Sequence, residues 1–206
     1  SAGNRSMIAE ALRISTRYDN LEFLKRLKID ISGLEELGKK LYPDGVSGNF
    51  KAKTDNTRRM EKTLAIIQFK LEEETIRQNP EYQMESRLWL DRLGEMLKNG
   101  DTEGLTDTHF PTIDPDNPTE LTTEEKLVID DLAHQFTKSD KVKYLMEFLF
   151  EFGKMYHIHN YILNIHALIP STEDGDFQEF HGKKGKALLD YIQETVKNVG
   201  KKYLND

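Results

Sequence analysis

The sequence predicts a mostly α-helical chain of the α+β class with one β-hairpin near its end. Apolar residues recur three or four positions apart through most of residues 7–152, which is the spacing of amphipathic helices. In residues 154–170 they alternate roughly with polar residues, as in paired strands, and helical spacing returns in residues 184–203. A lone hairpin is marginally stable in water, so we expect it to lie on helices, to pair with another chain or to belong to a larger sheet.

Capping and turn residues bound the first predicted helices. Residues 7–27 have helical spacing, and Asp19-Asn20 can cap a second segment inside that stretch. Ser32 and Glu35 have the spacing of a capping box, which opens a helix that extends to Leu41. The turn residues Tyr-Pro-Asp-Gly follow and end this helix, so the next ten residues are predicted to form a loop.

The strongest helix prediction covers residues 57–78. Its apolar stripe consists of Met60, Leu64, Ile67, Leu71 and Ile76, widened by Ile66 and Phe69. The three glutamates at 72–74 are predicted to lie on its solvated face. Asn79-Pro80 ends this helix and opens another that extends to about Leu97, because proline suits a first helical turn. That helix is expected to bury Met84, Leu88, Trp89 and Leu93.

A long connection without periodicity, residues 99–120, separates these helices from the later ones. Thr122 and Glu125 form a second capping box, for a helix that ends near Phe136. A further helix covers residues 139–152. Its expected inward residues are Val142, Leu145, Met146, Leu149 and Phe150. Those of the last helix are Leu188, Leu189, Ile192, Val196 and Val199.

Composition excludes several classes of protein. The 206 residues include 29 Lys and Arg against 36 Asp and Glu, a net charge of −7, which argues against a protein that binds nucleic acid through its phosphates. There is no cysteine, which excludes disulfides, thiolate ligands and cysteine nucleophiles. No apolar run approaches the roughly 18 residues of a membrane span. We therefore expect a chain without nucleic acid or membrane partners. The absence of cysteine also fits a reducing, cytoplasmic setting. The chain begins at Ser1 rather than at methionine, and we interpret it as a piece of a longer protein.

Histidines gather in the last quarter of the chain. If the hairpin turns at Asn160-Tyr161, then His157, His159, Asn164 and His166 share one face. Imidazoles on adjacent strands can reach one metal ion. That face carries no Asp or Glu, however, so we favour a solvated or partner-facing strand over a zinc site built wholly from the hairpin.

A basic segment with two glycines, residues 182–186, precedes the last helix. Backbone N–H groups at the start of a helix, together with lysines, can hold a phosphate. The segment lacks the spacing of a nucleotide-binding loop, so we favour an ordinary basic turn.

Three stretches of sequence carry a family resemblance. They are Leu-Ala-Ile-Ile-Gln-Phe-Lys-Leu-Glu at 64–72, Asp-Thr-His-Phe-Pro-Thr-Ile-Asp-Pro at 107–115 and Asn-Ile-His-Ala-Leu-Ile-Pro at 164–170. In this order and spacing they resemble class 3 fructose-1,6-bisphosphatase, a bacterial enzyme related to calcineurin-like metallophosphatases. The segment from Gly3-Asn4 to Leu21 is similar to the one that follows the family's Gly-Asn-His-Asp box.

The resemblance implies an enzyme that hydrolyses the 1-phosphate of fructose 1,6-bisphosphate in gluconeogenesis, with manganese or a similar divalent metal as cofactor. His166 is the one residue that matches a family metal ligand. The other metal-binding boxes of the family do not occur here, so the resemblance implies an internal fragment that is inactive alone. Residues 1–152 would form a helical insertion. Residues 153–206 would supply a hairpin, detached here from the calcineurin-like catalytic sheet, and a C-terminal helix; the free hairpin edges would permit homo-oligomers.

A second interpretation belongs to a different class of protein. The chain can be a helical interaction or regulatory module without chemistry of its own, because most of its helical region carries no motif. The coding sequence upstream of Ser1 distinguishes the two: a Gly-Asn-His-Asp box there supports the phosphatase.

Overall fold

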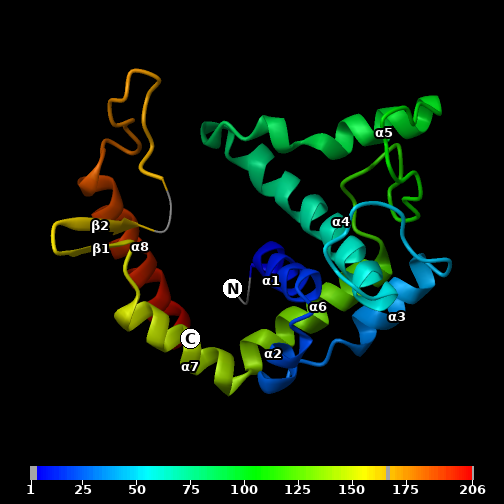
Figure 1. Ribbon diagram of the computed structural model, residues 1–206, viewed down its shortest axis with the longest axis horizontal. Coiled ribbons are helices and arrows are strands. Elements are labelled where there is room, and N and C mark those ends of the chain that lie inside the picture. Colours follow the sequence, from blue (N-terminus) through cyan, green and yellow to red (C-terminus); the bar gives the residue numbers. More distant parts are fainter. Residues whose placement is uncertain (1–3, 166–167, 206) are drawn as a thin grey trace. The chain divides into compact units, whose positions relative to one another are not determined.

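The computed structural model describes residues 4–165 and 168–205, and helices dominate it (Figure 1). The predicted mostly helical fold with a single hairpin is therefore confirmed for these residues. The chain divides into two compact units, Ser1–Ser139 and Asp140–Asp206. The sequence also predicts a boundary at residue 152, between a helical insertion and a phosphatase core. The compact units of this chain do not test that boundary, so it stays a prediction.

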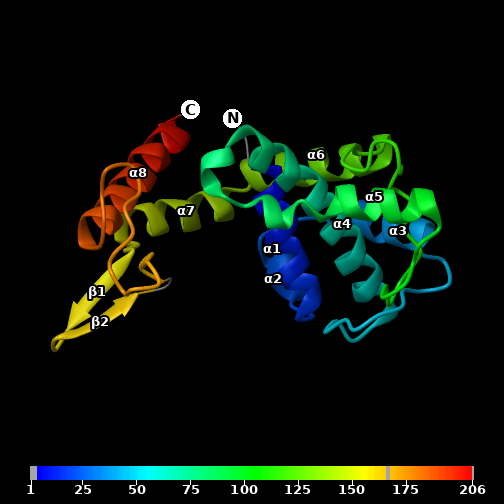
Figure 2. The same ribbon diagram turned by 90° about the horizontal axis from the view of Figure 1, so that it is seen from above.

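The first unit is built around α4 (Asp55–Gln78). Two helices, α1 (Arg5–Arg17) and α3 (Ser32–Leu41), pack against α4, and both also contact α6 (Thr123–Lys138) (Figures 1 and 2). The short α2 (Leu21–Arg26) follows α1, as the polar break at Asp19-Asn20 predicted. The most deeply buried apolar residues of this unit include Leu12, Leu24, Leu34, Met60, Leu64, Ile67, Leu90, Ile129 and Leu132.

α4 is buried on two faces rather than on one wide stripe. On one face, Gly38 of α3 lies so close to the α4 backbone at Arg59 and Met60 that a side chain there would be crowded. On the other, Ile66 belongs to a separate apolar cluster with residues of α5 (Trp89–Asn99) and of the connection that follows it. Phe69 stands edge-on to Trp89 in this second cluster, with ring centroids 4.8 Å apart.

The helix predicted from Pro80 is wrong in its first half. The chain forms two 3₁₀ turns, Pro80–Tyr82 and Glu85–Arg87, before α5 begins at Trp89. Gln83 interrupts the helix with a φ of 53°, in the left-handed region that a continuous right-handed helix cannot include. Leu93 is buried as expected, whereas Met84, Leu88 and Trp89 are only half-buried.

Glu73 corrects the expectation that residues 72–74 are solvated. Its side chain is 1% exposed, and its carboxylate accepts the Leu90 N–H at 3.0 Å and an Arg77 N–H at 3.3 Å. Burial raises the pKa of Glu73, and the hydrogen bond from Leu90 partly offsets this effect. Because no side chain at the start of α5 caps that helix, the carboxylate of Glu73 does so from α4.

We expect Glu73→Ala to lower the free energy of unfolding by about 1–2 kcal/mol, the cost of losing a helix cap. The substitution leaves the N–H of Leu90 buried without an acceptor. Urea denaturation followed by circular dichroism measures the change, with Glu74→Ala on the exposed side of the same turn as the matched control. Equal losses in the two variants would contradict the capping role.

Of the two capping boxes predicted from the sequence, one forms and the other does not. Thr122 and Glu125 form the predicted capping box of α6, with the Thr122 hydroxyl accepting the Glu125 N–H at 3.2 Å. Ser32 is not a cap, because it lies inside the first turn of α3 and its N–H donates to the Asp30 carboxylate at 2.9 Å. The Ser32–Glu35 capping box predicted from spacing alone is therefore wrong.

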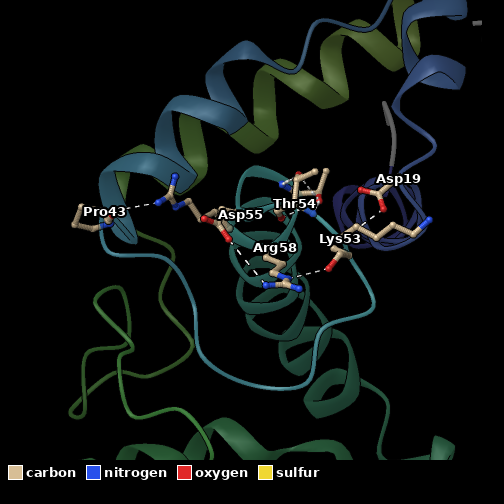
Figure 3. A network of polar contacts seen from close by, with 9 residues as sticks. Asp19, Pro43, Lys53, Thr54, Asp55 and Arg58 are labelled. Carbon is tan, nitrogen blue, oxygen red and sulfur yellow. Dashed lines mark hydrogen bonds and ion pairs between the residues drawn. The ribbon is translucent and has the colours of Figure 1, made fainter.

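The loop between α3 and α4 is tied to the start of α4 and to the end of α1 (Figure 3). Thr54 caps α4 and forms a capping box with Thr57, so the helix begins at Asp55, two residues before the predicted start at Thr57. Arg58 donates from Nε to the Ala52 carbonyl at 2.9 Å, and the Lys53 N–H donates to Asp19 at 3.3 Å (Figure 3).

The second unit contains the hairpin, in the predicted register. β1 (Tyr156–His159) pairs antiparallel with β2 (Ile162–Ile165), so that His157 lies opposite Asn164 and His159 opposite Ile162. Asn160 and Tyr161 form the turn with φ of 49° and 64°, which is the conformation of a two-residue type I′ turn. Within the described part of the chain, these two strands pair with no third strand.

Two helices accompany the hairpin. α7 (Asp140–Phe152) packs against α8 (Lys186–Asn205), where the ring of Phe150 fills the space that a side chain at Gly200 would need. Leu188 and Leu189 are buried as predicted. The expected inward residues Val196 and Val199 of α8, and Leu145 and Leu149 of α7, are instead exposed. Leu149 and Val196 line a shallow groove on the surface of this unit. None of the helices in residues 4–165 and 168–205 combines the length and apolarity needed to cross a bilayer.

Candidate functional site

His166, the metal ligand predicted from the family resemblance, lies outside the described residues, and its role stays a prediction. His157 and His159 lie on β1 with exposed side chains and nearly parallel rings, their centroids 6.2 Å apart. In the described ranges, no three His, Asp or Glu side chains come together as a group that could hold a metal ion. These residues by themselves therefore do not fit a two-metal centre.

The basic segment before α8 forms a tight turn. Lys183 and Phe180 exchange backbone hydrogen bonds of 2.8 and 3.0 Å, with His181 and Gly182 at the turn and both at positive φ. The ammonium of Lys183 lies 4.9 Å from the centroid of the Tyr191 ring. Lys186 donates to Asp190 at 2.5 Å, which raises the pKa of Lys186. Because side chains of the chain itself engage two of the three lysines of this segment, Lys183 and Lys186, the geometry favours the basic turn over a phosphate site.

The structure forms a surface pocket at a place where sequence patterns predicted no functional site. The pocket has a volume of about 630 Å³ and lies between the end of α3 with the loop after it, the first half of α4, and residues 107–111. Its lining includes Tyr42, Lys62, Asp107 and His109. Residues 107–111 are the first five residues of the stretch 107–115, which resembles class 3 fructose-1,6-bisphosphatase. This stretch therefore contacts α4 at the pocket.

Lys62 is the centre of the contacts beneath this pocket. Its Nζ donates to the Asp107 carboxylate at 2.5 Å and to the His109 carbonyl at 2.6 Å. The same ammonium lies 4.4 Å from the centroid of the Tyr42 ring and 4.9 Å from that of Phe110. With its side chain 6% exposed, Lys62 is committed to these partners, so it anchors residues 107–111 on α4 rather than presenting a free cation to solvent.

Burial sets the electrostatics of the pocket floor. It lowers the pKa of Lys62, although the hydrogen bond and charge of Asp107 oppose this effect. It also raises the pKa of the Tyr42 phenol, and the negative charges of Asp107 and Glu125 add to the increase. Tyr42 is therefore a neutral phenol throughout the physiological range of pH.

His109 is held in one tautomer at the rim of the pocket. Its Nε2 lies 3.1 Å from the Leu41 carbonyl, and because a carbonyl only accepts, Nε2 must carry the proton. The His109 N–H donates to Asp107 at 2.9 Å, which fixes the backbone next to the ion pair. The arrangement suits holding a loop or binding a polar group, and it places no nucleophile beside a general base.

A second, more deeply buried anchor lies two turns further along α4. Lys70 donates from Nζ to the Thr112 carbonyl at 2.6 Å and to Glu125 at 2.8 Å, and the two side chains are 0% and 1% exposed. Sequence reasoning missed both lysines because a lysine on an amphipathic helix is usually solvated. A signal was present: one face of the helix carries Lys62, Ile66, Phe69, Lys70 and Glu73 at helical spacing.

Comparison with protein families gives a match over residues 1–205 to Firmicute fructose-1,6-bisphosphatase. The chain belongs to this family. The resemblance stated from three short stretches is thereby confirmed. No solved structure matches the chain.

Individual relatives are named as class 3 fructose-1,6-bisphosphatases. A "Fructose-1,6-bisphosphatase class 3" of Clostridium botulinum (strain Alaska E43 / Type E3) is 39% identical over 194 residues, which cover 86% of this chain and 29% of the relative. Proteins of that name from Clostridioides difficile (strain 630) and Pediococcus pentosaceus are each 38% identical, over 96% and 100% of this chain and 33% and 34% of their own lengths. The chain thus spans about a third of the length of the curated relatives it matches.

Proposed function

We propose that this chain is part of a metal-dependent class 3 fructose-1,6-bisphosphatase, which hydrolyses the 1-phosphate of fructose 1,6-bisphosphate in gluconeogenesis. The observation that carries the proposal is the family match over residues 1–205. Because the chain spans about a third of its relatives, we assign the activity, the substrate and a manganese cofactor to the longer protein. The proposal places that protein in the cytoplasm.

The exposed hairpin supports a role within a larger sheet. A two-stranded hairpin is marginal in water, and this one leaves Ile158, Ile162 and Leu163 between 46% and 64% exposed. Neighbouring strands of a catalytic sheet would pair the free edges, and elements packed on the faces of that sheet would cover such side chains. We infer that the hairpin and α8 belong to the phosphatase core, and that the helical unit is an insertion into it.

The isolated chain is proposed to be inactive. A divalent metal pair supplies an activated water and holds the phosphate oxygens in hydrolases of this kind. The described residues lack a cluster of ligands for such a pair, so we assign none of them a step of the reaction. His166 is the single residue for which the resemblance suggests a ligand role.

We expect the isolated chain to release no phosphate from fructose 1,6-bisphosphate above background in the presence of manganese. A chimera in which this chain replaces the matching region of the Clostridioides difficile relative, 38% identical to it, should release phosphate. The control chimera carries a scrambled version of residues 140–206 in the same position. Turnover of about 1 s⁻¹ by the isolated chain, a rate typical of enzymes, would contradict the proposal that this chain is inactive alone.

A helical module without chemistry is the second candidate function. The observation that favours it is the first unit, which folds around α4 with anchors that hold loops rather than a reacting group. The coding sequence upstream of Ser1 decides between the two candidates. An unrelated domain there, without a Gly-Asn-His-Asp box, would favour the module.

A further inference from the structure

The hairpin of the second unit is partly buried only at its open end. Tyr156 and Ile165 lie opposite each other where β1 begins and β2 ends, and both are half-buried. The other residues of the two strands are exposed. Apolar burial along the strands therefore contributes little to holding this hairpin, although a free two-stranded hairpin is only marginally stable in water.

Polar side chains of α8 contact the hairpin at this open end. The Tyr156 hydroxyl donates to one carboxylate oxygen of Asp190 at 2.8 Å. Lys186 donates to the other oxygen of Asp190 at 2.5 Å, and its ammonium lies 5.6 Å from the centroid of the Tyr156 ring. Just before β1, the Met155 N–H donates to the Gln193 side chain at 3.1 Å. Positions 186, 190 and 193 lie on one face of a helix, so α8 presents a polar face to the start of the hairpin.

Asp190 is the group that joins the two elements. Its carboxylate accepts hydrogen bonds from the helix, through Lys186, and from β1, through Tyr156. These two hydrogen bonds lower the pKa of Asp190, so the carboxylate is ionised at neutral pH. Hydrogen bonds to an ionised acceptor are stronger than those between neutral groups. Because Tyr156 lies opposite Ile165, a contact that holds Tyr156 holds the ends of both strands.

We propose that the polar face of α8 keeps the hairpin folded without a third strand, and that this attachment depends on Asp190. The turn at Asn160-Tyr161 closes one end of the hairpin, and α8 closes the other. Closing both ends holds the strands in register and offsets part of the chain entropy that makes a free hairpin marginal. The contacts involve a side chain of β1 and a backbone group that precedes it, so they do not occupy the edge of either strand. All of them lie within this chain, and the proposal does not depend on the phosphatase assignment.

Hydrogen exchange of the complete 206-residue chain, followed by mass spectrometry, tests the proposal. Amides of residues 154–165 should exchange more slowly in the chain than in a synthetic peptide of the same residues. Tyr156→Phe and Asp190→Ala should each speed their exchange at least roughly 3-fold, the effect of losing one hydrogen bond. The double variant should exchange no faster than the faster single variant, because both substitutions remove the same contact. The matched control Glu194→Ala, at an exposed carboxylate of the same helix, should leave hairpin exchange unchanged.

Tyr156→Phe separates the attachment from the stability of the helix. Asp190 lies near the start of α8, where a negative charge also stabilises the helix itself, whereas Tyr156→Phe leaves the sequence of α8 intact. Its effect should therefore appear in the hairpin without faster exchange in α8 or in α4. Hairpin amides that exchange as fast in the wild-type chain as in the free peptide overturn the proposal. So does an effect of Tyr156→Phe or Asp190→Ala no larger than that of Glu194→Ala, or single effects that multiply in the double variant.

Discussion

Replacing Lys70 by methionine is expected to lower the free energy of unfolding by about 3–5 kcal/mol, the usual cost of removing one partner of a buried ion pair. Methionine fills a similar volume but leaves the Glu125 carboxylate without a counter-charge, in a place where that side chain is 1% exposed. It also removes the 2.6 Å hydrogen bond that the Thr112 carbonyl accepts from Lys70. Guanidinium denaturation at neutral pH, followed by circular dichroism, measures the loss.

A double variant separates the stranded charge from the lost packing. In Lys70→Met with Glu125→Gln, the glutamine can still accept the Thr122 N–H, which Glu125 accepts at 2.9 Å, and no buried charge remains. We expect this double variant to recover at least about half of the loss, since a neutral replacement of a buried pair is tolerated far better than half a pair. Lys126→Met, at an exposed lysine of α6, should change stability by less than about 0.5 kcal/mol. A double variant no more stable than Lys70→Met would contradict the ion-pair explanation.

Local signals in the sequence predicted most of the helices. The α6 capping box at Thr122 and Glu125, and the turn at Asn160-Tyr161, depend on residues close in the chain, and both are confirmed. The Ser32–Glu35 box failed although it has the same spacing. At that position the Asp30 carboxylate, two residues earlier, takes the Ser32 N–H and shifts the helix start.

Long-range contacts account for what the sequence did not reveal. Glu73 and Lys70 look like surface residues of an amphipathic helix, yet each is buried by a partner that comes from a distant segment. The partner of Glu73 is the Leu90 N–H, a backbone group that no residue pattern identifies. The pocket above Lys62 could not be predicted for the same reason, since its three walls meet only in the folded chain.

The candidate metal ligand could be proposed only from a family pattern. Composition and spacing placed His157, His159 and His166 on one face without distinguishing among them, and the structure leaves the first two solvent-exposed. Only the third matches a family histidine. Its neighbours Ala167 and Leu168 stand where the family pattern has glycine and cysteine, so a functional measurement must decide its role.

In the full-length protein that contains this chain, His166→Ala is expected to reduce manganese affinity or manganese-dependent turnover at least about 10–100-fold, the range known for losing groups that merely support a metal ligand. Removing a ligand itself deprives the metal of a bond, so the effect should reach or exceed that range. This expectation rests on the proposed phosphatase function. Phosphate release from fructose 1,6-bisphosphate, titrated with manganese, measures both the affinity and the turnover.

His157→Ala and His159→Ala are the matched controls, because they remove the same side chain from the same hairpin. Both imidazoles are exposed, and the family pattern requires nothing at their positions, so each should cost far less activity than His166→Ala. The pattern of the three variants carries the conclusion, since a general loss of hairpin stability would affect all of them. If His166→Ala keeps wild-type activity while either of the others abolishes it, the ligand is the other histidine, and the substitutions at 167 and 168 mark where this chain departs from its family.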